Sequence, residues 1–286
     1  MTQHSPTSAR RSSWLPSVSL IGVKFLELRR RGALMTVIVA FTVGLPVIFY
    51  GIRAIYHLSD PAHNGPAGAP TAFATAVTVM AEFGFIAAVL LGATAGTDDL
   101  TDGMFRQLVI TGRSRLALYL ARIPAGLSIL CSFAAVGFVV AALVTAFLNS
   151  PHAAGTLSPS AGSLVGAGLW LELYLVIGFM VGLGLSVLMG QRTVPVILLI
   201  VLEIIITPIL TDHALSHFVN VERLVVGVPM AQLKPAVLAG GAHVGPTGGL
   251  GLVLPPMPTW AIAAVISVWI MGWTAIGLWK MATRDA

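Results

Sequence analysis

The chain alternates between long apolar stretches and short polar connections over most of its 286 residues. Six stretches are nearly free of charged residues and long enough to cross the hydrocarbon core of a membrane, which takes about 20 residues as a helix. They fall at about 33–52, 72–96, 117–148, 163–189, 194–211 and 258–279. Because the connections are rich in Pro, Gly, Ser, Asp or Arg, the pattern predicts an all-α membrane protein with six transmembrane helices in one domain, 32–286.

The residues before the first apolar stretch have a different character. We expect residues 1–16, which are polar and serine-rich, to form a disordered cytoplasmic tail, and residues 17–31 to form a helix in the membrane interface. The apolar side of this helix holds Val18, Ile21, Phe25 and Leu28, and its charged side holds Lys24, Glu27, Arg30 and Arg31. A plain basic flank is the alternative. No small-residue cleavage site follows the first span, so we expect a retained anchor and no signal peptide.

The positions of Lys and Arg predict the orientation in the membrane. With six crossings, both termini lie on one side, and that side carries 13 of the 16 basic residues. These are Arg10, Arg11, Lys24, Arg29, Arg30, Arg31, Arg106, Arg113, Arg115, Arg122, Arg192, Lys280 and Arg284, against Arg53, Arg223 and Lys234 on the other side. Because loops rich in Lys and Arg stay in the cytoplasm, both termini are predicted to be cytoplasmic.

Composition narrows the class of protein further. Apolar residues make up 56% of the chain and charged residues 9%, against roughly 25% charged in soluble domains, which argues against a soluble enzyme. The net charge of +5 follows the predicted topology, so we expect no nucleic-acid partner. Cys131 is the single cysteine and has no second thiol with which to form a disulfide.

The long outer loop, 212–257, contains an apolar part at 225–239 that is interrupted by Pro229, Lys234 and Pro235. These residues break it too often for a membrane span. We expect a re-entrant or surface-lying pair of short helices, since irregular backbone at membrane depth must be buried in protein or line a cavity. A flexible loop is the alternative.

The loop after the second span, 96–115, carries acidic residues first and basic residues last. On a short helix that begins near Thr97 or Asp98 and ends near residue 112, this order complements the helix dipole. We expect this coupling helix to lie at the cytoplasmic surface. A partner protein would grip its apolar side chains, which are Met104, Phe105 and Leu108.

In this loop the chain resembles the permease subunits of ABC exporters of the ABC-2 type, also described as type V exporter-like. The family loop typically has a Glu, a Gly after three intervening residues, an apolar-rich stretch and a Pro-x-Ser-Arg-like end. Here Asp99 stands in the place of the Glu, Gly103 matches the Gly, Ser114-Arg115 match the end, and Gly112 replaces the Pro. The basic first helix, the six spans and the long last outer loop extend the resemblance over nearly the whole chain.

The resemblance implies a transport protein of the bacterial cell membrane that works with other chains. Two such permeases, identical or homologous, would form a dimer in the lipid membrane and bind two cytoplasmic ABC ATPase subunits. Those subunits would hold the ATP and Mg, and this chain would be neither an enzyme nor a cofactor carrier. It contains no Gly-x-x-x-x-Gly-Lys loop, because none of its three lysines follows a glycine. The implied ATPase-coupling residues are Asp99, Asp102, Gly103, Phe105, Arg106, Arg113 and Arg115. An amphipathic, lipid-like or drug-like substrate is implied by the apolar spans.

Three carboxylates fall inside or near the predicted spans, namely Glu82, Glu172 and Glu203. Because a charged side chain at the bilayer centre costs roughly 3 kcal/mol or more, each is expected to face protein, water or a partner. Glu82 and Glu203 are candidates for a translocation path, and packing between helices is the alternative. Glu172, nearer the outer end of its span, can reach the interface.

Helix packing has its own sequence signals. Pairs of glycines four residues apart, which allow close helix contact, occur at Gly92/Gly96, Gly162/Gly166 and Gly178/Gly182. Prolines at 46, 124, 195 and 208 are expected to kink spans or mark their ends.

Other functions stay open at this point. Asp99-Leu-Thr-Asp102-Gly103 fits the opening of the metal-binding signature of membrane CDP-alcohol phosphotransferases, but Arg106-Gln107 replace its Ala-Arg and the later carboxylates are missing. A stand-alone secondary transporter or channel would relay ions through the membrane carboxylates. A membrane scaffold or immunity protein would bind a partner without transport.

Overall fold

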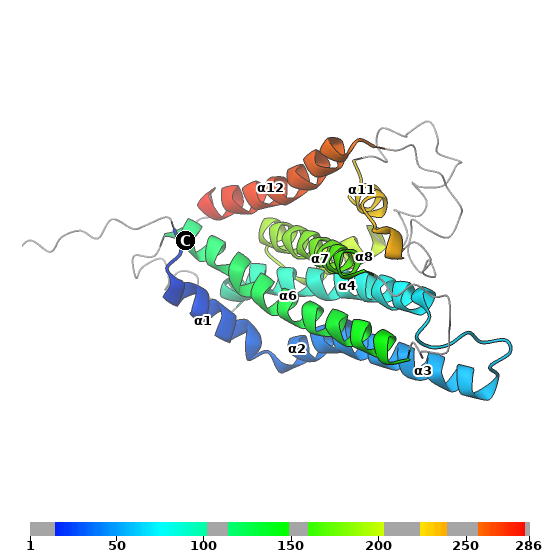
Figure 1. Cartoon of the computed structure of the whole chain (residues 1–286). Helices are drawn as coiled ribbons and strands as arrows, with labels where there is room; N and C mark the ends of the chain where they lie inside the picture. Colours follow the sequence, from blue (N-terminus) through cyan, green and yellow to red (C-terminus); the bar gives the residue numbers. More distant parts are fainter. Residues whose placement is uncertain (1–14, 102–113, 149–159, 203–223, 239–256, 284–286) are drawn as a thin grey trace, which may run out of the picture.

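The computed structural model describes residues 15–101, 114–148, 160–202, 224–238 and 257–283, and this part of the chain is helical with no strand (Figure 1). The elements are α1 (Val18–Arg29), α2 (Gly32–Val39), a π-helical turn η1 (Ala40–Gly44), α3 (Leu45–Ser59), α4 (Pro70–Thr101), α6 (Arg115–Leu148), α7 (Ala161–Met189), α8 (Thr193–Val201), α11 (Gly227–Gln232), the 3₁₀ turn η4 (Ala236–Leu238) and α12 (Thr259–Thr283).

Five helical segments of the described residues are long and apolar enough to cross a membrane, consistent with a multi-pass membrane protein. They are Gly32–Ser59, Pro70–Asp99, Arg115–Leu148, Ala161–Met189 and Thr259–Thr283, and they coincide with five of the six predicted spans. The all-helical fold predicted from the sequence is therefore confirmed. Of the remaining predicted span, 194–211, the structure describes α8 and Leu202, and the rest lies outside the described residues.

Helices α4 and α7 form the core of the bundle. In their most apolar windows 72% and 78% of residues are buried, against 17% in α12. Glycines make this packing close: a Cβ on Gly92 would lie 2.8 Å from the backbone nitrogen of Leu183, and a Cβ on Gly182 would lie 2.5 Å from the Val89 carbonyl oxygen. The pairs Gly92/Gly96 and Gly178/Gly182 thus lie in helix contacts. Gly162 and Gly166 have nothing within 4 Å of an added Cβ.

Contacts between helices define two ends of the bundle. The end of α4 meets the end of α7, where a Cβ on Gly96 would meet Ser186, and α6 begins there with Tyr119 against Gly277 near the end of α12. Leu20 of α1 packs on Ala117, Leu118 and Ala121 in the same first turns of α6. Figure 1 shows α1 and the C-terminal end of α12 at this end of the molecule, which is called the α1 end below, while α11 lies at the opposite end.

The first span is irregular. Its π turn, η1, precedes Pro46, and the Thr42 hydroxyl donates to the Ile38 carbonyl at 2.7 Å. A Cβ on Gly137 of α6 would meet the Thr42 carbonyl oxygen, so α6 approaches the backbone here. Further along, the Tyr50 and Thr145 hydroxyls are 2.6 Å apart. The wide turn therefore lies where the first span packs most closely on α6.

Helix α1 begins at Ser17, whose Oγ accepts a hydrogen bond from the Leu20 backbone N–H at 3.3 Å, as an N-cap does. A helix lies within the predicted range 17–31, and Ile21, Phe25 and Leu28 of its predicted apolar side pack against the protein, whereas Val18 is 85% exposed. Lys24, which the sequence pattern placed on the charged side, is buried. The reason is that Lys24 has a buried partner on another helix, which a helical wheel does not include.

The segment 224–238 consists of two short helical pieces, α11 and η4, separated by Leu233, Lys234 and Pro235. The prediction of a broken pair of short helices is confirmed. Two tryptophans fasten the segment to the bundle: Trp170 Nε1 of α7 donates to the Met230 carbonyl at 2.8 Å, and Trp269 Nε1 of α12 donates to the Leu224 carbonyl at 2.7 Å. It therefore packs against the spans and is not a detached loop.

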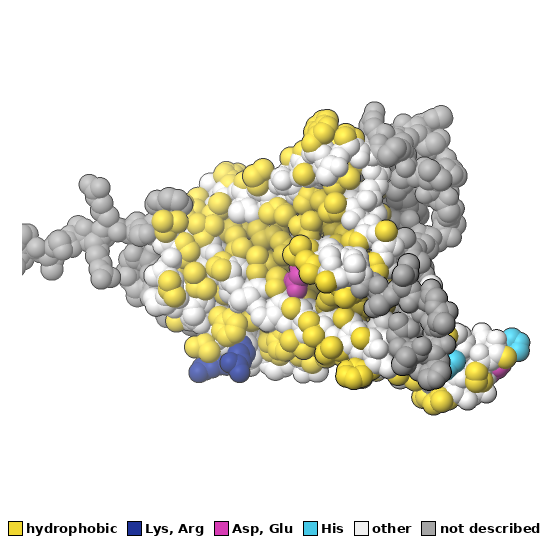
Figure 2. All heavy atoms as spheres, viewed as in Figure 1, with side chains coloured by type: hydrophobic (Ala, Val, Ile, Leu, Met, Phe, Trp, Pro, Cys, Tyr) yellow, Lys and Arg dark blue, Asp and Glu magenta, His cyan; other side chains and the backbone are white. Residues whose placement is uncertain are grey.

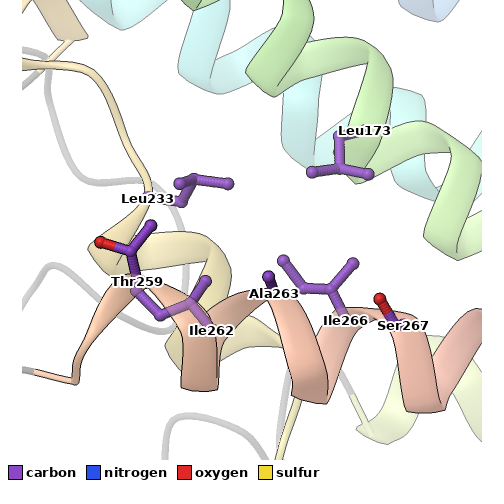
Figure 3. Close-up of a pocket in the computed structure, with 7 residues that line it drawn as sticks. All are labelled: Leu173, Leu233, Thr259, Ile262, Ala263, Ile266 and Ser267. Carbon is purple, nitrogen blue, oxygen red and sulfur yellow. The ribbon is translucent and has the colours of Figure 1, made fainter.

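The surface and one small cavity are mainly apolar. Figure 2 shows hydrophobic side chains over most of one face, Lys and Arg gathered near the α1 end, and His near the far end of α3. A cavity of about 210 Å³ lies between α7, Leu233 and the first turns of α12 (Figure 3). Its lining residues are Leu173, Leu233, Thr259, Ile262, Ala263, Ile266 and Ser267.

Candidate functional site

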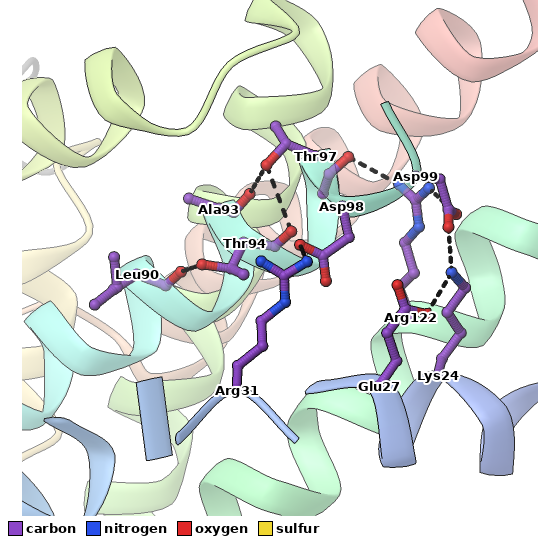
Figure 4. Close-up of polar contacts among 11 residues, drawn as sticks. Lys24, Glu27, Arg31, Leu90, Ala93, Thr94, Thr97, Asp98, Asp99 and Arg122 are labelled. Atoms are coloured by element: carbon purple, nitrogen blue, oxygen red, sulfur yellow. Dashed lines mark hydrogen bonds and ion pairs between the residues drawn. The ribbon is translucent and has the colours of Figure 1, made fainter. Parts of the chain in front are cut away.

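Charged side chains meet at the α1 end, where the last turn of α4 contacts α1 and the first turns of α6 (Figure 4). This ion cluster consists of Lys24, Glu27, Arg31, Asp98, Asp99 and Arg122. Four of its members are buried. With three cations and three carboxylates, the ion cluster is neutral when every group is ionised, which is the condition under which charges are tolerated away from water.

Asp99 lies at the centre of the ion cluster and is completely buried. Its Oδ1 accepts a hydrogen bond from Lys24 Nζ, and its Oδ2 accepts one from Arg122 Nη2 at 2.7 Å. Arg122 Nη1 also donates to the Gly96 carbonyl at 2.9 Å, which fixes the guanidinium against α4. One carboxylate therefore joins α1, α4 and α6.

The position of Asp98 and Asp99 explains why cations gather here. Both lie near the C-terminal end of α4, where the helix dipole disfavours negative charge. Arg31, in the short connection between α1 and α2, pairs with Asp98 at 2.8 Å, and Lys24 pairs with Glu27 at 2.8 Å. The end of α4 is thus stabilised by side chains that come from the N-terminal part of the chain.

Three buried polar atoms next to these pairs have no hydrogen-bond partner among the described residues: Arg122 Nε, Glu27 Oε1 and the Tyr119 hydroxyl. An unsatisfied buried polar group costs about 1–3 kcal/mol. Tyr119 lies one turn before Arg122 and against Gly277 of α12, where a Cβ would meet its ring. The ion cluster is therefore tightly packed, and the end of α12 lies beside it.

The structure describes three of the nine predicted site residues. Asp99 is in the ion cluster, Arg115 is the first residue of α6, and Glu82 lies midway along α4, partly buried. The other six lie outside the described residues: Asp102, Gly103, Phe105, Arg106, Arg113 and Glu203. Asp99 and Glu82 are about 25 Å apart along α4, at about 1.5 Å per residue, so they belong to separate sites.

The start of the predicted coupling helix is wrong. Helix α4 continues without a break to Thr101, and the Thr97 hydroxyl donates to the Ala93 carbonyl at 2.9 Å, as a residue inside a helix does. A new helix therefore does not begin at Thr97 or Asp98. The acidic types of Asp98 and Asp99 are explained by the ion cluster, since Asp98 binds Arg31 and Asp99 binds Lys24 and Arg122. Residues 102–113 lie outside the described part.

Of the ion cluster, only Asp99 was among the predicted site residues; Glu27 and Asp98 were not, and neither were the three basic members, Lys24, Arg31 and Arg122. The charge count recorded all three basic residues on the predicted cytoplasmic side. A weak signal for the pairing exists, because the predicted topology puts them on the same side as Asp98 and Asp99. Spacing along the chain gives no further help, since Lys24 and Asp99 are 75 residues apart.

No group of three or more His, Cys, Asp or Glu side chains is arranged to hold a metal ion in the described part of the chain. What the ion cluster offers chemically is a set of buried charge pairs that hold three helices in a fixed relation. Neither a family model nor a curated protein matches this chain.

Proposed function

We propose that the chain is the membrane-spanning permease subunit of an ATP-driven ABC-2 type exporter in a bacterial cell membrane. It expels an amphipathic, lipid-like or drug-like molecule from the cytoplasm. A second permease copy or homologue and two separate ATPase subunits complete the complex, and the ATPase subunits bind ATP and Mg. The observation that carries this proposal is the ion cluster. It joins α1, α4 and α6 next to residues 102–113, where the family resemblance expects the ATPase to bind.

A mechanism follows from this arrangement. The ATPase subunits press on the loop 102–113, and the force reaches the end of α4 directly. Because Asp99 is paired with both Lys24 and Arg122, α1 and α6 move together with α4. Asp99 is buried within the chain, so we assign it the role of transmitting motion and assign the contact with the ATPase to residues 102–113.

The proposal includes a fifth crossing, which brings the total to six. Helix α7 ends at the α1 end. Trp170 is the tenth residue of α7 and lies nearer the opposite end, and it donates a hydrogen bond to the Met230 carbonyl. The chain between Met189 and Gly227 therefore passes from one end of the bundle to the other. Helix α8 supplies nine residues of that path, or about 14 Å. The predicted span 194–211 supplies the remainder, and both termini then lie in the cytoplasm.

The test is purification of the tagged chain in mild detergent from the cell that produces it, with identification of the co-purifying chains and an ATPase assay. An ATP-binding subunit is expected to co-purify. Phe105→Ala or Arg106→Ala is expected to release it or to lower its ATPase activity by at least about tenfold, which is about 1.4 kcal/mol of coupling. Arg192→Ala removes an exposed cation from the same end and is the matched control.

A chain that purifies alone while known complexes survive the same conditions contradicts the proposal. The second candidate, a stand-alone secondary transporter, is favoured by one observation. Lys234 donates a hydrogen bond to the Thr78 hydroxyl, one helical turn before the span carboxylate Glu82, and partly buried ionisable groups of this kind often mark ion paths.

A further inference from the structure

Lys234 is a cation that the segment 224–238 brings against the spans. Its Nζ donates a hydrogen bond to the Thr78 hydroxyl of α4 at 3.1 Å and lies 5.9 Å from the centre of the Trp170 ring of α7. Thr78 and Trp170 are both buried. A lysine at a loop has water available to it, so a position between two span helices needs a specific recognition of its charge.

Two features of the surroundings provide that recognition. Glu82 lies one helical turn after Thr78 on the same face of α4, and its charge acts on Lys234. The Trp170 ring stacks on Tyr174, with centroids 5.8 Å apart and planes 13° apart. A carboxylate together with the face of an aromatic ring is the set of groups that binds organic ammonium ions in proteins.

Partial burial makes the charged form of Lys234 less favourable than it is in water. Burial lowers the pKa of the Lys234 ammonium below its ordinary value, and the Glu82 carboxylate acts in the opposite direction. The segment itself is fastened by backbone carbonyls, through Trp170 to Met230 and Trp269 to Leu224. Since those bonds do not use the lysine side chain, the ammonium is not needed to attach the segment.

An apolar space lies beside the same segment. Leu233, the residue before Lys234, lines the 210 Å³ cavity together with Leu173 and Ile266 (Figure 3). Leu173 lies on α7 three residues after Trp170 and one before Tyr174, so the cavity lies beside the helical turn that carries the aromatic pair. A ligand with a cationic head and an apolar body matches both parts.

We infer that Thr78, Glu82, Trp170 and Tyr174 form a binding site for a lipophilic organic ammonium ion, which the Lys234 side chain occupies in this structure. Lys234 is then a tethered competitor that leaves when the ligand enters. Naming this ion as the transported molecule rests on the proposed function, whereas its binding to the chain does not.

The test measures binding of benzyltrimethylammonium by isothermal titration calorimetry to the full chain in phosphatidylglycerol nanodiscs. Lys234→Met keeps the length of the side chain and removes its charge, and is expected to bind the probe about tenfold more tightly than wild type. Lys280→Met, the matched control, removes a lysine near the α1 end of α12 and is expected to bind like wild type. Lys234→Gln replaces Lys234→Met if the latter does not give a monodisperse protein.

Two double variants test the site itself. Adding Glu82→Gln or Trp170→Leu to Lys234→Met is expected to abolish the gain in affinity, while a cooperative thermal transition shows that the protein is folded. The inference is overturned if Lys234→Met binds no more tightly than wild type, or if the gain persists in both double variants. Because no ATPase is needed, this failure would leave the proposed exporter function standing, and co-purification tests that function separately.

The ammonium group can come from a free molecule or from a lipid headgroup. Repeating the titration in phosphatidylcholine nanodiscs separates these sources. If the choline lipid suppresses probe binding to Lys234→Met, the site takes a lipid headgroup; if binding is unchanged, the site takes a free cation. Both results support the ammonium site.

Discussion

At the scale of single residues, Asp99 shows what the sequence reveals and what it leaves out. The resemblance of its loop to that of ABC-2 permeases, in which Asp99 stands in the place of a Glu, identified it as a residue of interest. Its partners come from α1 and α6, and their approach depends on how α1 folds back against the bundle. Such pairing between distant segments has no counterpart in local spacing, so the sequence predicted a contact with another chain, which is still untested.

Asp99→Asn tests the ion cluster. The substitution removes the carboxylate that pairs with buried Arg122 and leaves Lys24 with Glu27 alone, and breaking a buried pair in this way costs about 3–5 kcal/mol. We expect a clearly lower Tm, measured by tryptophan fluorescence in detergent micelles. Asp60→Asn is the control, because Asp60 is 48% exposed and pairs with His63 at the surface, where the loss is about 0–1 kcal/mol. Equal Tm values for the two variants would show that the ion cluster contributes no stability.

At the scale of helices, hydropathy predicted the positions of five spans within a few residues, except that α3 and α4 run on to Ser59 and Thr101. The three glycine pairs have the same four-residue spacing in the sequence, and only two of them lie where two helices pack together. The spacing shows that a helix can be approached closely. Which helix approaches, and on which face, is decided by the packing of the whole bundle.

Gly92→Ala tests the contact between α4 and α7. The added methyl group would collide with the backbone of Phe179 and Leu183, which cannot move like the end of a side chain, so we expect a destabilisation of about 1–3 kcal/mol. Gly166→Ala is the matched control on α7: nothing lies near its Cβ, and alanine favours a helix by about 1 kcal/mol. Thermal melts of both variants should move in opposite directions. A fall in Tm for Gly166→Ala would mean that this face is covered by something else.

At the scale of the whole molecule, the described helices establish the two ends of the bundle without establishing which side of the membrane each end faces. The charge count predicts the side, because it depends on how the chain is inserted and not on how it packs. Burial and helix contacts in the folded chain are the same whichever side of the membrane each end faces.

Single cysteines in a Cys131→Ala background test the topology. Ala62→Cys, between α3 and α4, is expected to react with a membrane-impermeant maleimide on intact cells. Ser19→Cys on α1 and Ala282→Cys at the end of α12 are expected to react only after permeabilisation, because both lie at the α1 end. All three positions are exposed. Labelling of Ala282→Cys but not Ser19→Cys on intact cells would exclude an even number of crossings.

The pairing of Asp99 with both Lys24 and Arg122 also sets an order of events during biosynthesis. Lys24 leaves the ribosome roughly 100 residues before Arg122, which at about 5–20 residues per second is a delay of about 5–20 seconds. Until Asp99 and the first turns of α6 have been made, Lys24 lacks its carboxylate partner on α4 and α1 lacks the helix on which it packs. Docking of α1 therefore follows insertion of the third span and marks the point at which the first half of the protein is complete.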